Sequence, residues 1–371
     1  WVFCLRFYNN YWIFIKFKNK DQTFMKNEVI TIDLGSNSFR VLKYDCLNFK
    51  IIDEYHQVVG LADGLINSGL ISFEALNRVI DAINIAKDKL SFKPENAVCV
   101  TTAAMRKAKN SQEALDFIEK NSGAKFKIID SNEEARLTLL AIKYALKREK
   151  IDTQNFILLD IGGGSTELIV NFENNFYIKS FDFGIVTMTQ KSSKDGKLFE
   201  DLENQKIEIK KFLSTLDFSI KDFPFIATAG TPTTIASIKL GFSYFNYDKN
   251  IVNGTILDIK DLEDSLKLLK QKTIEELTEM VGKGRIEYLE IGTYIYRLFF
   301  DALEKENSIV FDDGLREGVA INYALSKKWS SVKKGVLHFA LELHWLVKQL
   351  NIQHLYLYLL LRSYLILFQN Q

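Results

Sequence analysis

The sequence contains few of the residues that break or crosslink a chain: three prolines, three cysteines and four histidines among 371 residues. The scarcity of proline excludes Pro-rich disordered linkers and allows long helices. Cys4, Cys46 and Cys99 are scattered and have no metal-ligand spacing. This pattern argues against a disulfide framework and structural zinc, and it fits the reducing conditions of a cytoplasmic protein.

An excess of charge of either sign is also missing. Lys and Arg number 48 against 47 Asp and Glu, which gives a net charge of +1. Because no global positive field attracts polyanions, we expect neither a nucleic-acid partner nor a membrane partner, and an anionic substrate must be bound by local groups. Length and a hydrophobic fraction of 47% allow two domains with full cores.

The commoner phosphate loops, Gly-x-x-x-x-Gly-Lys-Ser/Thr and Gly-x-Gly-x-x-Gly, are absent. Instead, one pattern occurs twice: Ile-Asp-Leu-Gly-Ser-Asn-Ser at 32–38 and Leu-Asp-Ile-Gly-Gly-Gly-Ser-Thr at 159–166. Each copy is an apolar β-run, an aspartate (Asp33, Asp160), a Gly/Ser turn and a second β-run. Such a turn directs backbone N–H groups and hydroxyls at one spot, which suits a phosphate. The aspartate before it can hold a hydrated Mg²⁺.

The two copies lie 127 residues apart and predict two similar α/β domains with a cleft between them. Ordinary glycine-rich turns would explain either copy alone, but they would not explain why the acid recurs in register. The first domain, predicted over 25–132, should contain strands at 29–34, 39–45, 50–58, 97–101 and 125–129 and helices at 72–90 and 111–121. The second, over 133–328, should contain a helix at 133–149, strands at 156–161, 166–172, 176–183 and 224–228, a helix at 200–216, and further helices.

Both ends differ in composition from the middle. Residues 1–24 begin with Trp and are rich in residues with AT-rich codons, so we expect a non-native or disordered extension before Met25. A signal peptide is the alternative, but charged residues interrupt its apolar run. Residues 329–371 form an unassigned apolar tail, for which a shifted reading frame or a truncated domain are equal explanations. Its apolar run at 355–368 is short for a membrane span.

Two clusters near the predicted domain boundary are candidates for catalysis. In Ser131-Asn132-Glu133-Glu134, the serine and Glu134 fit a helix capping box. Alternatively, Glu133 or Glu134 faces the cleft as the general base that takes a proton from an attacking water. Arg106, expected in a loop after the strand 97–101, can neutralise charge on a transferring phosphate. The alternative is a solvated loop arginine beside two lysines.

Two later segments suggest further anion-binding or capping elements. Residues 227–234 form a small-residue turn that opens a helix, so the N–H groups around Gly230 and Thr231 can make a third anion site. Rigidification of a loop by Pro232 is the alternative. In residues 312–318, Asp313 and Gly314 suit a simple helix N-cap.

These motifs, in this order, resemble the exopolyphosphatase/guanosine-pentaphosphate phosphatase (Ppx/GppA) family of the actin-like ATPase superfamily, over about residues 28–327. The resemblance implies an α/β fold of two ribonuclease-H-like domains with an interdomain cleft. It also implies Mg²⁺-dependent hydrolysis of terminal phosphates of inorganic polyphosphate or of the 5′ γ-phosphate of guanosine pentaphosphate. We further expect a homodimer.

The resemblance assigns roles residue by residue. Glu134 is the base, with Glu133 left open, Arg106 binds the transferring phosphate, and Glu167 assists at the metal or the water. Asp160 carries Mg²⁺, with Asp33 as a second candidate. The phosphate-binding candidates come from the two turns and the later helix: Asp33, Gly35, Ser36, Asn37, Ser38, Gly162, Gly163, Gly164, Ser165, Thr166, Gly230 and Thr231.

Two other function classes stay open from the sequence. A kinase or ATPase of the same superfamily would share the hairpins but take its base from elsewhere, and a non-catalytic sensor would keep the phosphate-binding turns and lose the base. A long polyanion would need a local basic track, and a solvated helix face is the alternative for its candidates. These candidates are Lys191, Lys194, Lys197, Lys206, Lys210 and Lys211.

Overall fold

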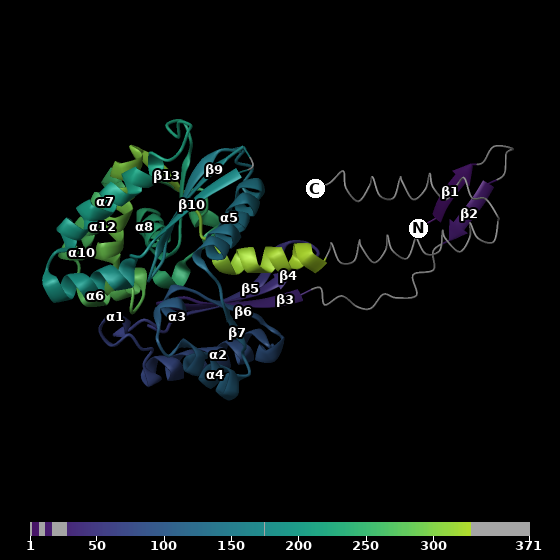
Figure 1. The fold of residues 1–371 in the computed structure, drawn as a ribbon, viewed down its shortest axis with the longest axis horizontal. Helices are drawn as coiled ribbons and strands as arrows, with labels where there is room; N and C mark the ends of the chain where they lie inside the picture. The colour runs from purple at the N-terminus through teal and green to yellow at the C-terminus, as the bar shows by residue number, and fades with distance from the viewer. Residues whose placement is uncertain (1, 7–11, 17–27, 174, 328–371) are drawn as a thin grey trace.

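The protein was analysed as a computed structural model, which describes residues 2–6, 12–16, 28–173 and 175–327 (Figure 1). Strands β1 (Val2–Arg6) and β2 (Trp12–Lys16) pair antiparallel as a separate two-stranded sheet. The apolar tail at 329–371 and the residues around Met25 lie outside the described chain. Among the described residues, no helix is long and apolar enough to cross a membrane.

A mixed five-stranded sheet forms the first half of the molecule, in the order β5–β4–β3–β6–β7. Neighbours β3, β4 and β5 are antiparallel, whereas β6 and β7 run parallel to β3. The strands are β3 (Glu28–Leu34), β4 (Ser38–Asp45), β5 (Lys50–Val58), β6 (Val98–Thr101) and β7 (Phe126–Ile128). All five were predicted within one or two residues.

A six-stranded sheet forms the second half and repeats the plan, in the order β10–β9–β8–β11–β13–β12. Here too a meander of three antiparallel strands is followed by parallel strands. The strands are β8 (Phe156–Ile161), β9 (Thr166–Phe172), β10 (Asn175–Phe181), β11 (Phe225–Thr228), β12 (Ile256–Asp258) and β13 (Asn307–Val310). The last two were not predicted, because they lie after residue 228, where only a loop and further helices were expected.

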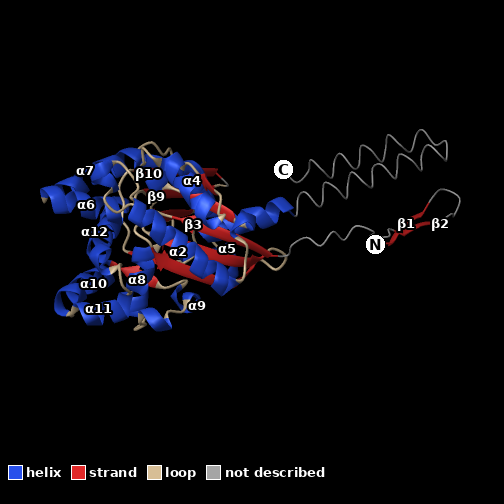
Figure 2. Cartoon of the chain, turned by 90° about the horizontal axis from the view of Figure 1, so that it is seen from below, coloured by secondary structure: helices blue, strands red, loops and turns tan. Residues whose placement is uncertain are grey.

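Helices cover both sheets (Figures 1 and 2). In the first half, α2 (Phe73–Leu90) and α4 (Ser111–Ser122) pack on one face, with α1 (Leu65–Ser68) and α3 (Ala103–Lys107) beside them. The second half carries α6 (Ile185–Asp195), α7 (Leu198–Leu213), α8 (Gly230–Lys239), α9 (Lys249–Val252), α10 (Ile259–Gln271), α11 (Ile274–Val281) and α12 (Ile286–Leu303). Helices α1, α3 and α6 had not been predicted, whereas α9 to α12 lie where further helices were expected.

Helix α5 (Ser131–Arg148) lies between the two sheets and contributes to both cores. Leu139 and Ile142 pack with Phe156 of the second sheet, while Leu140 packs with Leu42 of the first. Apolar residues on two sides of one helix are typical of a helix buried between layers. The N-terminus of α5 is therefore fixed relative to both halves, which positions Glu134.

The last described helix, residues 315–327, crosses α5 and packs on the first sheet although it follows the second in sequence. Gly318 permits the crossing, because any Cβ at this position would collide with the backbone carbonyl of Leu137. Thr31 of β3 donates its hydroxyl to the Arg316 carbonyl at 3.1 Å. The chain thus returns to the first half, and the limits 25–132 and 133–328 stay a prediction.

Candidate active site

The two repeated turns close in the same way. The Gly35 N–H donates to the Ser38 carbonyl at 2.9 Å, and the Gly162 N–H donates to the Ser165 carbonyl at 3.0 Å. One further carbonyl in each turn is bound by the chain outside the turn. The Ser36 carbonyl accepts from the Ala62 N–H, and the Gly163 carbonyl accepts from N–H groups in the first turn of α6. Because a trans peptide points its C=O and N–H in opposite directions, the following N–H groups point the other way.

Four backbone N–H groups of the turns consequently have no acceptor in the described chain: those of Ser36, Asn37, Gly163 and Gly164. Successive N–H groups of this kind form an anion-binding concavity. Gly184 makes the arrangement possible on the second side, because a Cβ there would lie 2.7 Å from the Gly163 carbonyl oxygen. The structure thus brings the predicted turn residues together with their N–H groups free, and their binding of phosphate stays a prediction.

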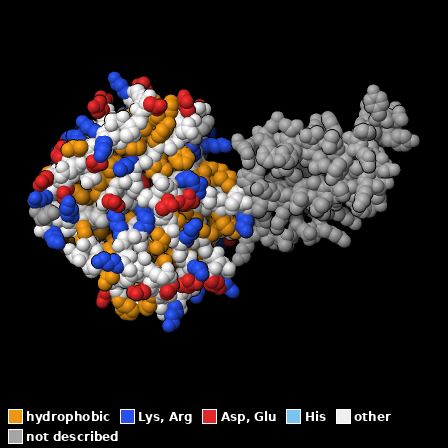
Figure 3. Space-filling model, viewed as in Figure 1, with side chains coloured by type: hydrophobic (Ala, Val, Ile, Leu, Met, Phe, Trp, Pro, Cys, Tyr) orange, Lys and Arg blue, Asp and Glu red, His pale blue; other side chains and the backbone are white. Residues whose placement is uncertain are grey.

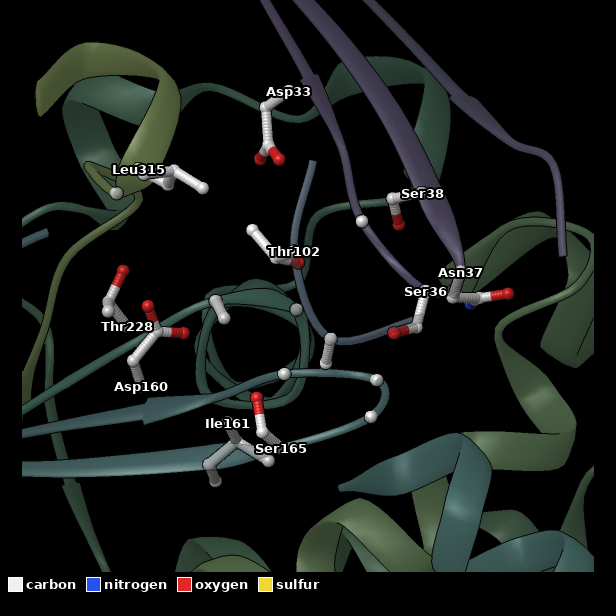
Figure 4. Close-up of a pocket in the computed structure, with 18 of the residues that line it drawn as sticks. Asp33, Ser36, Asn37, Ser38, Thr102, Asp160, Ile161, Ser165, Thr228 and Leu315 are labelled. Atoms are coloured by element: carbon white, nitrogen blue, oxygen red, sulfur yellow. The ribbon is translucent and has the colours of Figure 1, made fainter. Parts of the chain in front are cut away.

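A cavity between the two turns receives side chains from both halves of the molecule (Figure 4). The turns approach closely, since a Cβ built on Gly164 would lie 2.6 Å from Ser36 Oγ. The predicted residues that line the cavity are Asp33, Gly35, Ser36, Asn37, Ser38, Glu134, Asp160, Gly162, Gly163, Gly164, Ser165 and Gly230. Sequence reasoning missed Arg40 and Ile185. The other lining residues belong to segments that it had singled out without assigning them to the site: Thr102, Ala103, Ile161, Thr228, Ala229, Asp312, Asp313, Gly314 and Leu315.

The residue opposite each aspartate differs between the two copies. Asp33 of β3 pairs in register with Arg40 of β4, and Asp160 of β8 pairs with Glu167 of β9. Directly opposed residues of antiparallel strands lie on the same face of the sheet. The first copy therefore combines an acid with a cation, and the second combines two acids.

Arg40 is the most informative residue that the sequence analysis did not name. It lines the main cavity and an adjoining one that it shares with Arg285, and its guanidinium forms no hydrogen bond or ion pair within the described residues. An unpaired guanidinium is a strong bidentate partner for a phosphate. The seven-residue offset that separates Asp160 from Glu167 also separates Asp33 from Arg40, and aligning the repeats on this offset would have found it.

Glu134 lies in the first turn of α5 and faces the cavity. The helix is capped by Asp130, whose carboxylate accepts the Glu133 N–H at 2.8 Å, so the alternative of a Ser131–Glu134 capping box is wrong. The Glu134 carboxylate instead accepts a hydrogen bond from Arg106 Nη1 at 2.8 Å. Its environment is that of a functional group in a cleft, because no backbone N–H needs it as a cap.

Arg106 lies in the short helix α3 and not in the predicted loop. The same Nη1 atom donates to the Ile129 carbonyl and to Glu134, each at 2.8 Å. Its side chain is 19% exposed, so the solvated-arginine alternative does not describe it. Arg106 is not among the residues that line the cavity, and it reaches the site through its contact with Glu134.

Glu133 points elsewhere. It forms a two-pronged ion pair with Arg136, with distances of 2.7 and 2.8 Å, and its side chain is 38% exposed. This hydrogen bonding lowers the pKa of Glu133. Of the two neighbouring glutamates, Glu134 alone lines the cavity, which favours it over Glu133 as the base.

The acids of the second copy are held by hydroxyl groups. Thr138, one turn after Glu134 on α5, donates to Asp160 Oδ2 at 3.1 Å. Ser180 of β10 donates to Glu167 Oε1 at 2.7 Å. Glu167 is 1% exposed and does not line the cavity. Thr166 is equally buried and donates its hydroxyl to the Phe183 carbonyl, so the structure uses it to brace the hairpin.

Burial raises the pKa of four carboxyl groups at the site, those of Asp33, Glu134, Asp160 and Glu167. The pKa of Asp33 rises to about 6 and that of Glu134 to about 7, the latter despite the opposing effect of Arg106. The pKa of Asp160 is raised by burial, and that of Glu167 is raised well above its usual range by burial and by the charges of Glu134 and Asp160. A cluster of acids with raised pKa values in a cleft is a common mark of a functional site.

This charge distribution fits a magnesium ion on the side of the second copy. Asp160 and the buried Glu167 are acids opposite each other, burial raises the pKa of both, and a cation would relieve the cost of ionising them. Within the described residues no three acids, histidines or cysteines form a complete metal site. Mg²⁺ binds through one or two carboxylates and completes its shell with water and phosphate oxygens, and its presence here stays a prediction.

The third expected anion site is only partly at the cavity. Helix α8 begins at Gly230, which lines the main cavity, after Ala229 with a positive φ of 74°. Thr231 is buried against Gly292 of α12 and lines the adjoining cavity instead. The structure therefore brings Gly230 to the two turns and places Thr231 beside Arg40 and Arg285.

The segment 312–318 is more than an N-cap. Gly314 precedes the last helix, and its N–H donates to Glu317 Oε2 at 2.9 Å. The Asp313 carboxylate accepts from Arg148 Nη2 at 2.7 Å and lies 3.6 Å from Lys249 Nζ. Asp312, at the cavity edge, accepts from Tyr247. This ion cluster joins the end of α5 to the last helix and fixes the wall of the cavity.

The expected basic track on α6 and α7 carries local ion pairs. Lys191 pairs with Asp201 at 2.6 Å and Lys197 with Glu200 at 3.6 Å. Lys206 and Lys211 likewise have acidic neighbours. Positive and negative side chains are interspersed over the visible face of the protein (Figure 3), in keeping with the balanced composition. A polyanion would have to compete with these acids.

Comparison with known proteins agrees with the geometry. The sequence profile of the Ppx/GppA phosphatase family matches residues 40–327. The chain belongs to this family. Its match to the profile includes Arg40, Glu134, Asp160 and the ion cluster around Asp313.

The chain is similar to several members of known sequence or structure. It is 26% identical over 299 residues to a bifunctional 3-dehydroquinate synthase/phosphatase of Fusobacterium nucleatum, which is 76% of this chain and 44% of that protein. It is 28% identical over 322 residues to a guanosine-5′-triphosphate,3′-diphosphate pyrophosphatase of Pseudoalteromonas translucida, which is 84% of this chain and 62% of that protein. The chain thus spans less than two thirds of the length of either relative.

A solved structure carries the same fold. The Aquifex aeolicus member of the Ppx/GppA family superposes with a TM-score of 0.62 at 26% identity, over 81% of this chain and 98% of that one. Two similar α/β halves, expected from the repeated hairpins, and the actin-like fold that the resemblance implied are therefore confirmed.

Proposed function

We propose that this protein hydrolyses terminal phosphoanhydride bonds of inorganic polyphosphate or of the 5′ end of guanosine pentaphosphate, by attack of a water that Glu134 activates. The observation that carries the proposal is the placement of Glu134, whose buried carboxylate opens α5 between the two turns. Its pKa of about 7 suits a base that must accept a proton near neutral pH. The Pseudoalteromonas relative, named for a guanosine substrate, supports this substrate class.

The unpaired N–H groups of the turns and the Arg40 guanidinium bind the terminal phosphates. These donors are fixed by the hairpins before substrate arrives, so little reorganisation is needed when negative charge develops. Asp160, assisted by Glu167, would hold Mg²⁺, which supplies charge neutralisation of the phosphate oxygens when bound. The first copy has Arg40 where the second has Glu167, and this difference accounts for an anion at the first copy and a cation at the second.

The Arg106–Glu134 ion pair has to rearrange during the reaction. Arg106 lowers the pKa of Glu134, so a guanidinium that turns from Glu134 to the substrate phosphate leaves a stronger base behind. Arg106 then stabilises the charge that spreads over the transferring phosphoryl group. The water loses its proton to Glu134 as its oxygen attacks the terminal phosphorus. The bond from this phosphorus to the bridging oxygen breaks, and the rest of the substrate leaves on the opposite side.

Phosphate release from polyphosphate, guanosine pentaphosphate and ATP by the full chain with Mg²⁺ tests the proposal. We expect release from the first two and its loss in Glu134→Gln. Glu133→Gln is the matched control, because it changes the neighbouring charge and leaves the cavity intact. Transfer of the ATP γ-phosphate to a sugar would instead indicate the kinase alternative, and tight binding without turnover would indicate the sensor alternative.

A further inference from the structure

A second polar cavity lies at the opposite end of α5 from Glu134. It has a volume of about 480 Å³, which falls in the usual range for ligand pockets. Figure 1 shows α5 beside β9 and β10 in this part of the molecule. The lining residues, none of which belongs to the active-site cavity, are Lys143, Leu146, Lys147, Lys150, Ile151, Asp152, Thr153, Gln154, Phe156 and Asn171. We refer to it as the lysine cavity.

Three lysines give the lysine cavity a positive charge. Lys143 and Lys147 are one turn apart on α5, so their side chains share a face of the helix, and Lys150 follows just after the helix ends. Lys143 and Lys150 are seven residues apart, which corresponds to ~10 Å along a helix. With Asp152 as the one acid that lines the cavity, the formal charge of its lining is +2.

The lysine side chains have no counter-ions. Within the described residues Lys143, Lys147 and Lys150 form no ion pair and no side-chain hydrogen bond. Lys143 is half-buried, and burial lowers the pKa of its ammonium group. A cation that is partly removed from water without an acidic partner is costly, and a bound anion offsets this cost. By contrast, lysines of the expected α6–α7 track already have carboxylates beside them.

Asn171 adds an unsatisfied acceptor to the same cavity. Its side chain is 2% exposed, and its amide nitrogen donates to the Gln154 carbonyl at 2.5 Å. The other end of the carboxamide, Oδ1, has no hydrogen-bond partner. Buried acceptors in native proteins are nearly always satisfied, so this atom needs a donor. Phosphate oxygens are themselves acceptors, so a water that also donates to a bound phosphate would satisfy it.

We propose that the lysine cavity binds a chain of condensed phosphates, as a site separate from the hydrolytic cleft. Lysine is a common phosphate ligand because its ammonium acts as a point charge that tolerates many geometries. The choice of condensed phosphate among anions rests on the proposed function. Inorganic polyphosphate and the phosphates of a nucleotide share this chemistry. Since α5 measures ~27 Å from end to end, a long inorganic chain can contact both sites.

Isothermal titration calorimetry with tripolyphosphate, on full-length Glu134→Gln in EDTA, tests this proposal without hydrolysis. We expect two classes of site. Adding Lys143→Gln, Lys147→Gln and Lys150→Gln should weaken one class by at least about tenfold, because contacts with charged groups are lost. The matched control replaces three exposed lysines of other helices that also lack ion pairs, Lys87, Lys120 and Lys260, and should keep both classes. Repeating the titration with GTP distinguishes an inorganic source from a nucleotide source.

Binding of tripolyphosphate by the lysine-cavity variant with the stoichiometry and affinity of the control would overturn the proposal. To show that the variant is folded, the three lysine substitutions are also made in the protein that keeps Glu134. Circular dichroism and release of phosphate from a short substrate are then measured on it. If the lysine-cavity variant keeps its hydrolysis and loses one class of binding site, the second site is supported. If the Glu134 protein hydrolyses nothing while the lysine variant loses a binding class, the proposed function fails and the second site stands.

Discussion

The two hairpins share a backbone and differ in charge. Both turns close with the same hydrogen bond, both present unpaired N–H groups, and both follow an aspartate. Opposite that aspartate stands Arg40 in the first copy and Glu167 in the second. On the proposed function, this one duplicated scaffold supplies an anion-binding wall with Arg40 and a cation-binding wall with Asp160 and Glu167. Arg40 lines the cavity itself, whereas Glu167 is buried and does not line it.

Glu134 lies between the two walls, so its removal should have the largest effect. We expect Glu134→Gln to lower kcat by about 10²–10⁴-fold, because glutamine keeps the shape but cannot accept the proton. Substrate binding should change little. Stopped-time phosphate assays and equilibrium binding measure the two quantities. Normal turnover in Glu134→Gln together with loss in Glu133→Gln would reverse the assignment.

Arg106 should matter for rate and for pH dependence. Arg106→Ala should lower kcat by about 10²–10³-fold at saturating Mg²⁺, through lost transition-state stabilisation. In the parent protein kcat/KM should rise with pH through about 7 as Glu134 loses its proton. Because Arg106 lowers that pKa, its removal should move the acidic limb to higher pH. A profile whose acidic limb stays in place would show that the ion pair does not tune the base.

Asp160→Asn tests the cation wall. We expect it to raise the Mg²⁺ concentration needed for half-maximal activity by about 100-fold, more than loss of an outer-shell contact would, because an anionic ligand is lost. Mn²⁺ binding followed by electron paramagnetic resonance gives a second readout. An unchanged metal dependence would place the ion elsewhere.

Arg40→Ala tests the anion wall. We expect a rise of about tenfold in KM for phosphate substrates, the size of one lost charge-assisted hydrogen bond, with an unchanged Mg²⁺ dependence. Steady-state kinetics at several Mg²⁺ concentrations separates this from the effect at Asp160. Identical metal curves for the two variants would mean that the walls do not have different roles.

Thr138→Val should give the smallest effect. Loss of the hydroxyl that donates to Asp160 frees the carboxylate to rotate, and we expect metal affinity to fall by about tenfold. Thr138→Ser keeps the donor and should restore affinity. Thermal denaturation serves as the control, since Thr138 is fully buried and a stability loss shared by both variants would indicate packing instead.

Much of this molecule follows from local sequence. Short apolar runs predicted β3, β4 and β8, each of which pairs with its neighbour over six or more residues, and helical spacing predicted α2. The short strand β13 was not predictable in this way. It exists because parallel β11 and antiparallel β12 lie on either side of it, and those contacts come from distant parts of the chain.

The choice between Glu133 and Glu134 illustrates the limit most clearly. Adjacent helical residues differ by about 100° in direction, so the sequence alone left both open. The start of α5 at Asp130 and its burial between two sheets direct Glu134 to the cavity and Glu133 to Arg136. The capping box predicted for Ser131 and Glu134 was wrong by one residue, because in the structure Asp130 is the cap and accepts the Glu133 N–H.

The sequence by itself determined the duplication, the aspartates before each turn and the pair of candidate bases, Glu133 and Glu134, because these depend on residue type and short-range order. Only the tertiary structure decided that Arg40 lines the cavity while Glu167 does not, that Arg106 reaches Glu134, and that Lys143 and Asn171 share a second cavity. These relations join residues that are distant along the chain. They are set by strand register and by the packing of α5, which local preferences do not encode.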